Sequence, residues 1–192
     1  MTQELRQDTR DRISDSFKQL VVTKGFEKMI VKDITDGAGL ARPTFYIYFQ
    51  DKYEVAEYIF DRDVGDIVRP LLENGFVREA FLNLLVRMDK DKEYYRRMYK
   101  VDGQNAFSQI MHKCFMQDMI KVIARKRAGA ETENRLFTPE NIAEYLFNIF
   151  RFVIAKWLER SEDDVTINTA MEGYDIMTSH TINDILGDDP RA

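Results

Sequence analysis

The stretch GLARPTFYIYFQDK, residues 39–52, holds a glycine, a proline, an arginine and four aromatic residues within fourteen positions. Phe45 and Phe49 are four residues apart, so a helix would place them on one face, which is expected to be buried. Pro43 suits the first turn of that helix, where its missing N–H leaves no hydrogen bond unmade. Tyr46 and Tyr48 lie off the phenylalanine face and carry hydroxyls. The pattern therefore predicts a short helix with a buried apolar face and tyrosines beside it.

The residues before this stretch predict two further helices. Apolar residues recur at helical spacing over about residues 4–24, namely Ile13, Phe17, Leu20 and Val21. Gly25 stands where a C-terminal cap belongs. Residues 31–38 predict a short second helix that Gly39 ends. Two short helices joined by a glycine-containing turn, with a long helix before them, form a helix-turn-helix.

A helix-turn-helix inserts the first turn of its last helix into the major groove of DNA. Arg42, Pro43 and Thr44 occupy that turn. Arginine can donate two hydrogen bonds to the edge of guanine, and threonine offers a hydroxyl or a methyl group. The hydroxyls of Tyr46 and Tyr48 are placed to meet phosphate oxygens. The alternative is that the two tyrosine rings are partly buried core.

Charge restricts where DNA could bind. The 192 residues carry a net charge of −5, which by itself argues against a nucleic-acid partner. Residues 1–52, however, hold nine Lys and Arg against eight Asp and Glu, a net of +1. Residues 53–192 hold nineteen against twenty-five, a net of −6. Only the N-terminal quarter could therefore approach phosphates without strong repulsion.

Composition is that of a globular protein, with 44% apolar and 32% charged residues. No stretch reaches the roughly 18 consecutive apolar residues of a membrane span, so no membrane association is expected. A single cysteine, Cys114, suits a reducing cytoplasm. Two histidines and one cysteine form no metal-ligand pattern, and no phosphate-binding glycine loop occurs. We therefore expect no enzyme: no catalytic residues, no metal site and no cofactor.

Residues 25–55, GFEKMIVKDITDGAGLARPTFYIYFQDKYEV, resemble the TetR/AcrR family of bacterial transcription regulators. The resemblance is carried by Gly25-Phe26, by the segment from Asp33 to Gly39, and by TFYIYF followed by Lys52. It implies an all-α fold with an N-terminal three-helix DNA-binding domain and a larger C-terminal helical domain for ligand binding and dimerisation.

Applied to this chain, the family pattern implies a domain boundary between residues 1–52 and 53–192. It implies that DNA bases are contacted by Lys32, Arg42, Pro43 and Thr44, and that the DNA backbone is held by Tyr46, Tyr48 and Lys52. Family members usually have Ser or Thr in place of Ile30 and often Ser in place of Ala41, and both residue types cap helices. Without these caps we expect modest affinity or an unusual operator. A reading in which a partner protein does the regulatory work stays open.

The C-terminal part predicts helices over about residues 51–70, 76–88, 104–126, 139–160 and 165–186, and a charged stretch over 90–107 that breaks near Asp102-Gly103. The helix over 139–160, begun by Thr138, is apolar nearly all round, so it must be buried on two sides. One side can pack on its own chain and the other on a second copy. The family pattern likewise implies a homodimer formed by the last two helices, with expected contacts at Ile149, Val153, Trp157, Tyr174 and Met177.

A ligand pocket in this part would be lined by Tyr99, Phe107, Met111, Phe147 and Phe150. Plain core packing accounts for each of these residues without a ligand and stays the alternative. Residues 94–107, YYRRMYKVDGQNAF, are similar to the family subset that controls dihydroxyacetone-kinase operons, where a partner protein supplies the signal.

The sequence thus predicts a homodimeric, cytoplasmic regulator that binds a double-stranded DNA operator, acting as a repressor released by an effector. The effector is either a small molecule or a protein partner. The alternative function is a TetR-like coactivator or adaptor whose activity is set by a protein partner.

Overall fold

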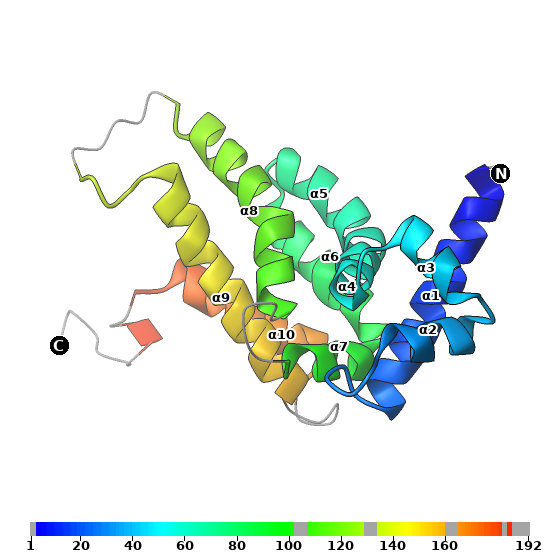
Figure 1. Cartoon of the computed structure of the whole chain (residues 1–192). Helices are drawn as coiled ribbons and strands as arrows, with labels where there is room; N and C mark the ends of the chain where they lie inside the picture. Colours follow the sequence, from blue (N-terminus) through cyan, green and yellow to red (C-terminus); the bar gives the residue numbers. More distant parts are fainter. Residues whose placement is uncertain (1–2, 102–106, 129–133, 160–164, 182–183, 186–192) are drawn as a thin grey trace. The chain divides into compact units, whose positions relative to one another are not determined.

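The computed structural model describes residues 3–101, 107–128, 134–159, 165–181 and 184–185. Every regular element in these ranges is helical, which confirms the all-α class (Figure 1). None of the described helices is both long and apolar enough to cross a membrane. The elements are α1 (Gln3–Thr23), α2 (Val31–Ala38), α3 (Arg42–Tyr48), α4 (Lys52–Phe60), the π-helical η1 (Asp61–Gly65), α5 (Asp66–Glu73), α6 (Val77–Asp89), α7 (Lys92–Tyr99), α8 (Phe107–Lys126), α9 (Pro139–Glu159) and α10 (Ile167–Ser179).

The chain forms two compact units. The first unit comprises Met1–Ile67 and Arg87–Phe115, and the second comprises Val68–Val86 and Met116–Ala192. The helix-turn-helix of α2 and α3 lies in the first unit, together with α1, α4, η1 and α7. The boundary after residue 52 stays a prediction.

The buried face of α1 organises the first unit. Its apolar residues Ile13, Phe17 and Val21 are fully buried. The ring of Phe17 meets Phe26 edge-on at a centroid distance of 6.1 Å and Tyr94 of α7 at 6.3 Å. The expected amphipathic helix over about 4–24 is confirmed, and these ring contacts hold α1 against both the loop before α2 and helix α7.

Gly39 forms the turn between α2 and α3, and Gly37 allows α2 to pack on α1. Gly39 has φ 63°, a left-handed conformation that residues with a Cβ rarely adopt, and it caps α2. Gly37 is needed for space, because a methyl group there would collide with the hydroxyl of Ser16 on α1. That buried hydroxyl donates to the carbonyl of Ile34 at 2.8 Å. Helices α1 and α2 can therefore approach each other closely at this point.

In the second unit, stacked rings and an exposed ion pair join α6 to α9 and α10. Phe81 of α6 stacks on Phe150 of α9 at 4.6 Å and contacts Tyr174 of α10 at 4.9 Å. Arg78 binds Asp175 through two hydrogen bonds of 2.7 Å each, which ties α6 to α10. These contacts join segments that are more than sixty residues apart in sequence.

Helix boundaries largely follow the sequence, with three corrections. The expected helix over 51–70 contains the π-helical turn η1 and ends at Glu73, because Gly75 (φ 78°), not Pro70, provides the left-handed cap. The last helix ends at Ser179 and not near residue 186, because the backbone of His180 is extended (ψ 147°). Beyond it, the backbone N–H and the hydroxyl of Thr181 both donate to the Asp184 carboxylate. Residues 182, 183 and 186 lie outside the described ranges.

The third correction adds α7, which lies within the charged stretch for which no helix bounds were predicted. Lys92–Tyr99 is helical, and Tyr94, Tyr95 and Met98 are buried. Residues spaced by one and four positions share one face of a helix, so these three form an apolar stripe. The charged residues between them obscured this pattern in the sequence.

Candidate nucleic-acid interface

Helix α3 has one buried face and one exposed face. Phe45 and Phe49 are buried, with ring centroids 5.8 Å apart, as their spacing predicts. Tyr46 is 48% exposed and Ile47 is 69% exposed. The buried rings anchor α3 to its unit, and the face of this seven-residue helix that carries Tyr46 and Ile47 is open to solvent.

Arg42 and Tyr46 form a pair on the exposed face. The Nη2 atom of Arg42 donates to the Tyr46 hydroxyl at 3.1 Å, and the guanidinium lies 5.7 Å from the centre of the tyrosine ring. The two residues are four apart, one helical turn. A contact made by either side chain therefore involves the other.

Tyr48 has different surroundings from Tyr46. It is half-buried, and the guanidinium of Arg10 on α1 lies 6.0 Å from its ring centre and 5.3 Å from that of Tyr58. The alternative of a partly buried ring thus describes Tyr48, whereas Tyr46 projects from the helix.

The beginning of α2 carries its own acidic cap. Ile30 occupies the N-cap position and its side chain accepts no hydrogen bond, so the carboxylate of Asp33 accepts from the Ile30 N–H at 2.9 Å instead. Hydrogen bonds from Lys24 and from that N–H lower the pKa of Asp33. Ala41, at the N-cap of α3, likewise provides no side-chain cap. The two missing caps predicted from the sequence are confirmed.

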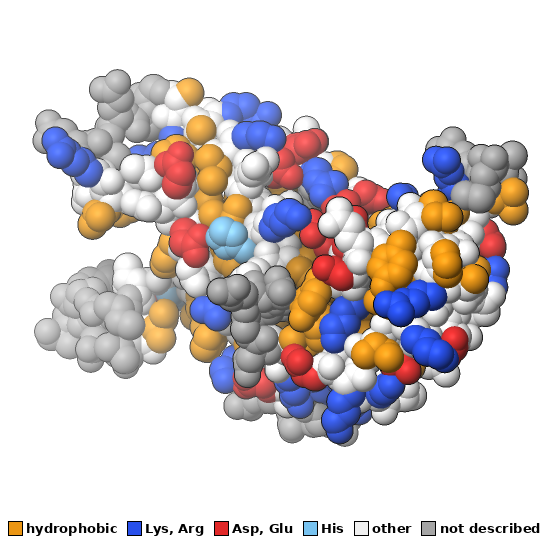
Figure 2. Space-filling model, in the orientation of Figure 1, with side chains coloured by type: hydrophobic (Ala, Val, Ile, Leu, Met, Phe, Trp, Pro, Cys, Tyr) orange, Lys and Arg blue, Asp and Glu red, His pale blue; other side chains and the backbone are white. Residues whose placement is uncertain are grey.

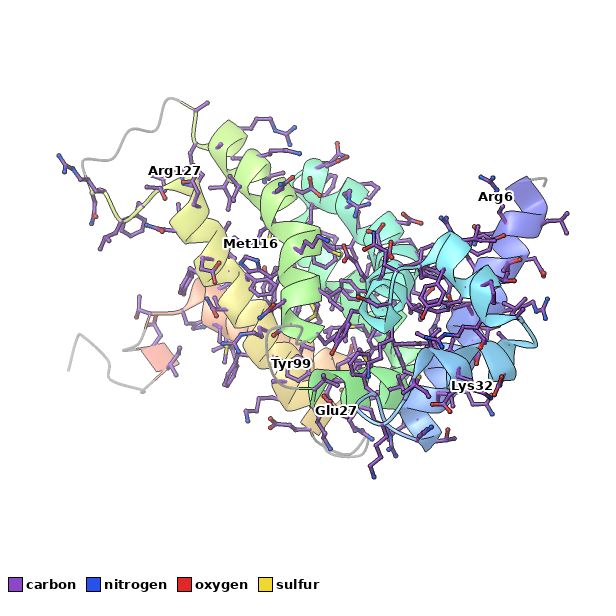
Figure 3. The ribbon with its side chains drawn as sticks, viewed as in Figure 1. Arg6, Glu27, Lys32, Tyr99, Met116 and Arg127 are labelled. Atoms are coloured by element: carbon purple, nitrogen blue, oxygen red, sulfur yellow. The ribbon has the colours of Figure 1, made fainter. Side chains whose placement is uncertain are left out.

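Lys32 projects from α2 into solvent (Figure 3). Its side chain is 69% exposed, and its only described ion pair is with Asp36, one turn along the helix. The hydrogen bond to Asp36 raises the pKa of Lys32. Because both partners are exposed, the pair is weak and a competing anion could replace Asp36.

Lys52 is engaged by its own chain. Its ammonium donates to the carbonyls of Phe26 at 2.8 Å and Met29 at 3.1 Å, and it lies 4.4 Å from the ring centre of Phe26. Lys52 therefore fastens the loop between α1 and α2 to the start of α4, where Asp51 caps the helix by accepting from two backbone N–H groups.

Arg12 is a positioning residue that the sequence analysis missed. Its Nη2 atom donates to the carbonyls of Ala38 at 2.6 Å and Gly39 at 3.2 Å, so it holds the turn that precedes α3. The signal was its spacing of four residues from Ser16, which places both side chains on the α1 face that meets α2.

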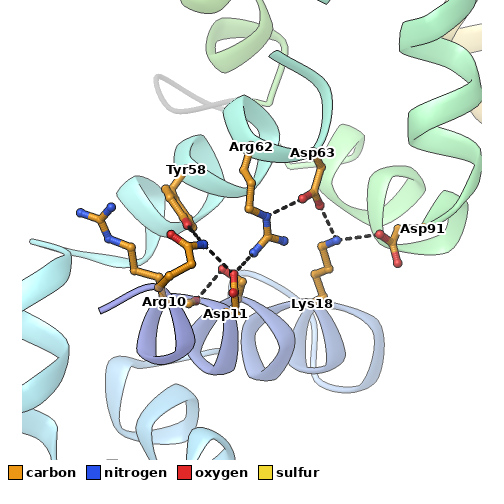
Figure 4. Close-up of polar contacts among 9 residues, drawn as sticks. Arg10, Asp11, Lys18, Tyr58, Arg62, Asp63 and Asp91 are labelled. Atoms are coloured by element: carbon orange, nitrogen blue, oxygen red, sulfur yellow. Dashed lines mark hydrogen bonds and ion pairs between the residues drawn. The ribbon is translucent and has the colours of Figure 1, made fainter. Parts of the chain in front are cut away.

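Five charged residues form an ion-pair cluster next to the π-helical turn, comprising Asp11, Lys18, Arg62, Asp63 and Asp91 (Figure 4). Lys18 lies between Asp63 at 2.5 Å and Asp91 at 2.6 Å. Arg62 binds Asp63 at 2.6 Å and Asp11 at 2.7 Å. The cluster joins α1, η1 and the N-cap of α7.

Burial and hydrogen bonding compete at Asp63. Desolvation alone would raise the pKa of this carboxyl group, since the side chain is only 20% exposed. Hydrogen bonds from Arg62 and Lys18 favour the charged form and outweigh desolvation, so the pKa of Asp63 is lowered.

Four of the five expected pocket residues are buried, and Tyr99 is half-buried. Tyr99, Phe107 and Met111 belong to the first unit, and Phe147 and Phe150 belong to the second. Phe107 is buried against Phe60 at a centroid distance of 5.2 Å, and Phe150 stacks on Phe81. Core packing accounts for these two rings, and the ligand pocket stays a prediction.

The expected dimer residues are mostly covered by their own chain. Ile149, Val153, Trp157 and Tyr174 are buried, and Met177 is half-buried. The apolar side chains that α9 and α10 leave exposed are others: Tyr145 at 61%, Phe152 at 48% and Ile176 at 45%. Sequence reasoning missed them because it could not tell which side of each helix its own chain covers.

This arrangement defines a helix-turn-helix DNA-binding protein of the transcription-regulator class. Residues 15–59 match the family model for bacterial regulatory proteins of the tetR family. Over these residues the chain is similar to a family whose members are transcription regulators. As in solved relatives, an N-terminal helix-turn-helix domain is followed by a helical C-terminal domain.

Two curated relatives are similar over different lengths. The HTH-type dhaKLM operon transcriptional activator DhaS of Lactococcus lactis is 28% identical over 94 residues, which cover 49% of this chain and 50% of DhaS. The putative mycofactocin biosynthesis transcriptional regulator MftR of Mycobacterium tuberculosis is 24% identical over 178 residues, covering 86% and 87%. The match thus spans half the length of DhaS and most of MftR.

Among solved structures, the SmeT–triclosan complex superposes with a TM-score of 0.68 at 18% identity, covering 89% of this chain and 90% of SmeT. This likeness shows the shared fold.

Proposed function

We propose that the protein is a homodimeric repressor that binds a double-stranded DNA operator through α2 and α3 and is released by an effector. The observation that carries the proposal is the exposed Arg42–Tyr46 pair, fixed to its unit by the buried Phe45 and Phe49 behind it. A regulator of this kind works where the chromosome lies, so we place it in the cytoplasm.

The contacts fall into two groups with different consequences. Base-edge contacts select the sequence, and backbone contacts fix position and affinity. We assign the first role to Lys32, Arg42, Pro43 and Thr44, and the second to Tyr46 and Tyr48. Because Arg42 binds the Tyr46 hydroxyl, these two roles are coupled at one point of the interface.

For Lys52 we propose an indirect part in holding the DNA backbone. Its ammonium already donates to the Phe26 and Met29 carbonyls, so it acts by positioning the loop before α2. Lys52→Met should lower the unfolding free energy by about 1 kcal/mol and leave the slope of log affinity against log salt unchanged. A slope reduced by about 1 would instead identify Lys52 as a direct phosphate contact.

The primary test is selection of bound fragments from random DNA with the purified protein, followed by affinity measurement on the selected site. Sequence-specific binding by the protein alone supports the repressor. If no sequence is enriched and DNA binding appears only with a second protein, the result supports the adaptor function and contradicts the repressor function.

We propose that the dimer forms through the exposed faces of α9 and α10, with contacts at Tyr145, Phe152 and Ile176. Isolated apolar side chains are common on surfaces, but these three lie on the two helices that the family pattern assigns to dimerisation. A two-fold dimer would place its two recognition helices about 34–36 Å apart, one turn of DNA.

Sedimentation tests this interface. The protein should be a dimer at micromolar concentration, and Phe152→Glu or Ile176→Glu should yield a folded monomer. Phe76→Glu, an equally exposed change in the same unit, is the matched control and should stay dimeric. A wild-type monomer with an unchanged circular-dichroism spectrum would contradict the proposal.

A second candidate function is a coactivator or adaptor set by a protein partner. Its support is the similarity to DhaS, which is described as an operon activator. For the repressor, we propose that the effector is a small molecule. The support is the fold similarity to SmeT, whose structure is a complex with triclosan. A small molecule at ~100 times its dissociation constant should stabilise the protein by roughly 2.7 kcal/mol in a thermal-shift assay, whereas a protein-controlled regulator should respond only to its partner.

A further inference from the structure

Ile47 is a large apolar side chain that the fold leaves in solvent. The side chain of Ile47 is 69% exposed, whereas Phe45 and Phe49, two positions before and after it, are buried. A single exposed apolar residue on a surface needs no explanation. Ile47, however, lies on α3 directly beside the Arg42–Tyr46 pair, and it shares its row with a second exposed apolar residue, Pro43, four positions earlier.

The exposed face of α3 therefore consists of two rows. One row is polar and comprises Arg42 and Tyr46, joined by their hydrogen bond. The other is apolar and comprises Pro43 and Ile47. Figure 2 shows hydrophobic and basic side chains next to one another on the surface over α3. The guanidinium of Arg42 and the apolar row of Pro43 and Ile47 lie side by side on this face. Such a surface is complementary to a groove that offers hydrogen-bond acceptors next to a methyl group.

The major groove of DNA has such a pattern. Guanine offers two acceptors to an arginine, and the C5-methyl group of thymine is the apolar group on the groove floor. Isoleucine in a helix strongly prefers one χ1 rotamer, so little side-chain freedom is lost when it makes a contact. The helix also holds it rigidly relative to Arg42, which sets the spacing between the two contacts.

We propose that Ile47 is a specificity-determining residue that contacts the C5-methyl group of a thymine near the guanine bound by Arg42. The inference rests on the proposed operator-binding function. It predicts that each half-site contains a position where thymine is preferred because of its methyl group alone.

The test removes one methyl group from the DNA and the side chain from the protein. In the selected operator, each thymine is replaced in turn by deoxyuridine, which keeps the base-pairing edge and lacks only the C5-methyl. The wild-type protein should lose roughly fourfold in affinity at one position per half-site, the equivalent of one buried methyl group. Ile47→Ala should bind the thymine operator more weakly and show no further loss with deoxyuridine at that position.

Phe76→Ala, an exposed apolar change in the second unit, is the control and should retain the full deoxyuridine effect. Unchanged circular dichroism of Ile47→Ala verifies its fold. If the protein binds an operator but Ile47→Ala keeps the same deoxyuridine loss, or weakens all operators equally without removing it, the assignment is overturned. If no operator is bound at all, it is the proposed function that fails.

Discussion

Two groups of charged side chains in the first unit differ in how far away in the sequence their partners lie and in how exposed they are. On α2 and α3, Lys32 pairs with Asp36 and Arg42 with Tyr46, each within four residues and exposed to solvent. In the ion-pair cluster, Lys18 and Arg62 bind partners 45 to 73 residues away and are only 16% and 26% exposed, apart from the adjacent Arg62–Asp63 contact.

The difference indicates two roles for charged side chains, one in binding DNA and one in stabilising the fold. Ion pairs within one helical turn contribute little to stability and can be exchanged for a phosphate or base edge. Partly buried pairs between distant segments hold those segments together, and removing one partner leaves the other charge uncompensated. Substitutions in the cluster should therefore change folding, and substitutions on α2 and α3 should change DNA binding.

The largest effect is expected for Arg62→Ala. It leaves the partly buried Asp63 with one partner fewer and frees Asp11, so the unfolding free energy should fall by about 2–4 kcal/mol. Urea denaturation followed by circular dichroism measures this. A loss no greater than that of an exposed pair would remove the distinction between the two groups.

The pH dependence of Asp63 sharpens the same distinction. Its folded-state pKa is lowered, so its stabilising contribution is present above the unfolded pKa of about 3.9 and is lost as pH falls through the folded value. Asp63→Asn should cost about 1.5–3 kcal/mol at pH 6. Denaturation midpoints of the two proteins should converge as the pH falls below about 4, and a constant difference down to pH 3 would contradict the assignment.

Arg42→Ala should act on DNA binding and not on folding. We expect a loss of about 1–3 kcal/mol in operator affinity and relaxed preference at one base pair. Tyr46→Phe should weaken binding to all sequences alike. Because the two side chains are hydrogen-bonded, the double variant should lose less than the sum of the single losses. Intact affinity and base preference in Arg42→Ala would refute the recognition assignment.

The smallest change in stability is expected for Lys32→Ala. Its pair with Asp36 is exposed on both sides, so the urea midpoint should stay unchanged while operator affinity falls. A shift in the midpoint comparable to that of Arg62→Ala would show that local and long-range pairs contribute alike.

The helix-turn-helix was predictable because its signals are local. The four-residue spacing of Phe45 and Phe49, the turn at Gly39 and the proline in the first turn of α3 each act within one or two helical turns. The family pattern then indicated a DNA interface on that helix. Ile47 escaped notice because its spacing gives no sign of whether another element covers it.

Two further features escaped the sequence analysis, each for its own reason. The apolar spacing of Tyr94, Tyr95 and Met98 was present in the sequence, yet the surrounding charges hid α7. Trp157 was expected at a dimer contact, and its own chain buries it completely. Periodicity identifies an apolar face, but only the packed structure shows which chain covers that face.

The sequence by itself determined the helices of the first sixty residues, their caps and turns, and the family that residues 25–55 resemble. Hydrogen bonds within a helix and the conformations of glycine and proline depend on near neighbours. Only the tertiary structure decided that Lys52 binds carbonyls, that Arg12 braces the turn before α3, and that Lys18 and Arg62 join α1, η1 and α7. Those contacts join residues 23 to 73 positions apart, and such partners are selected by the packing of whole helices.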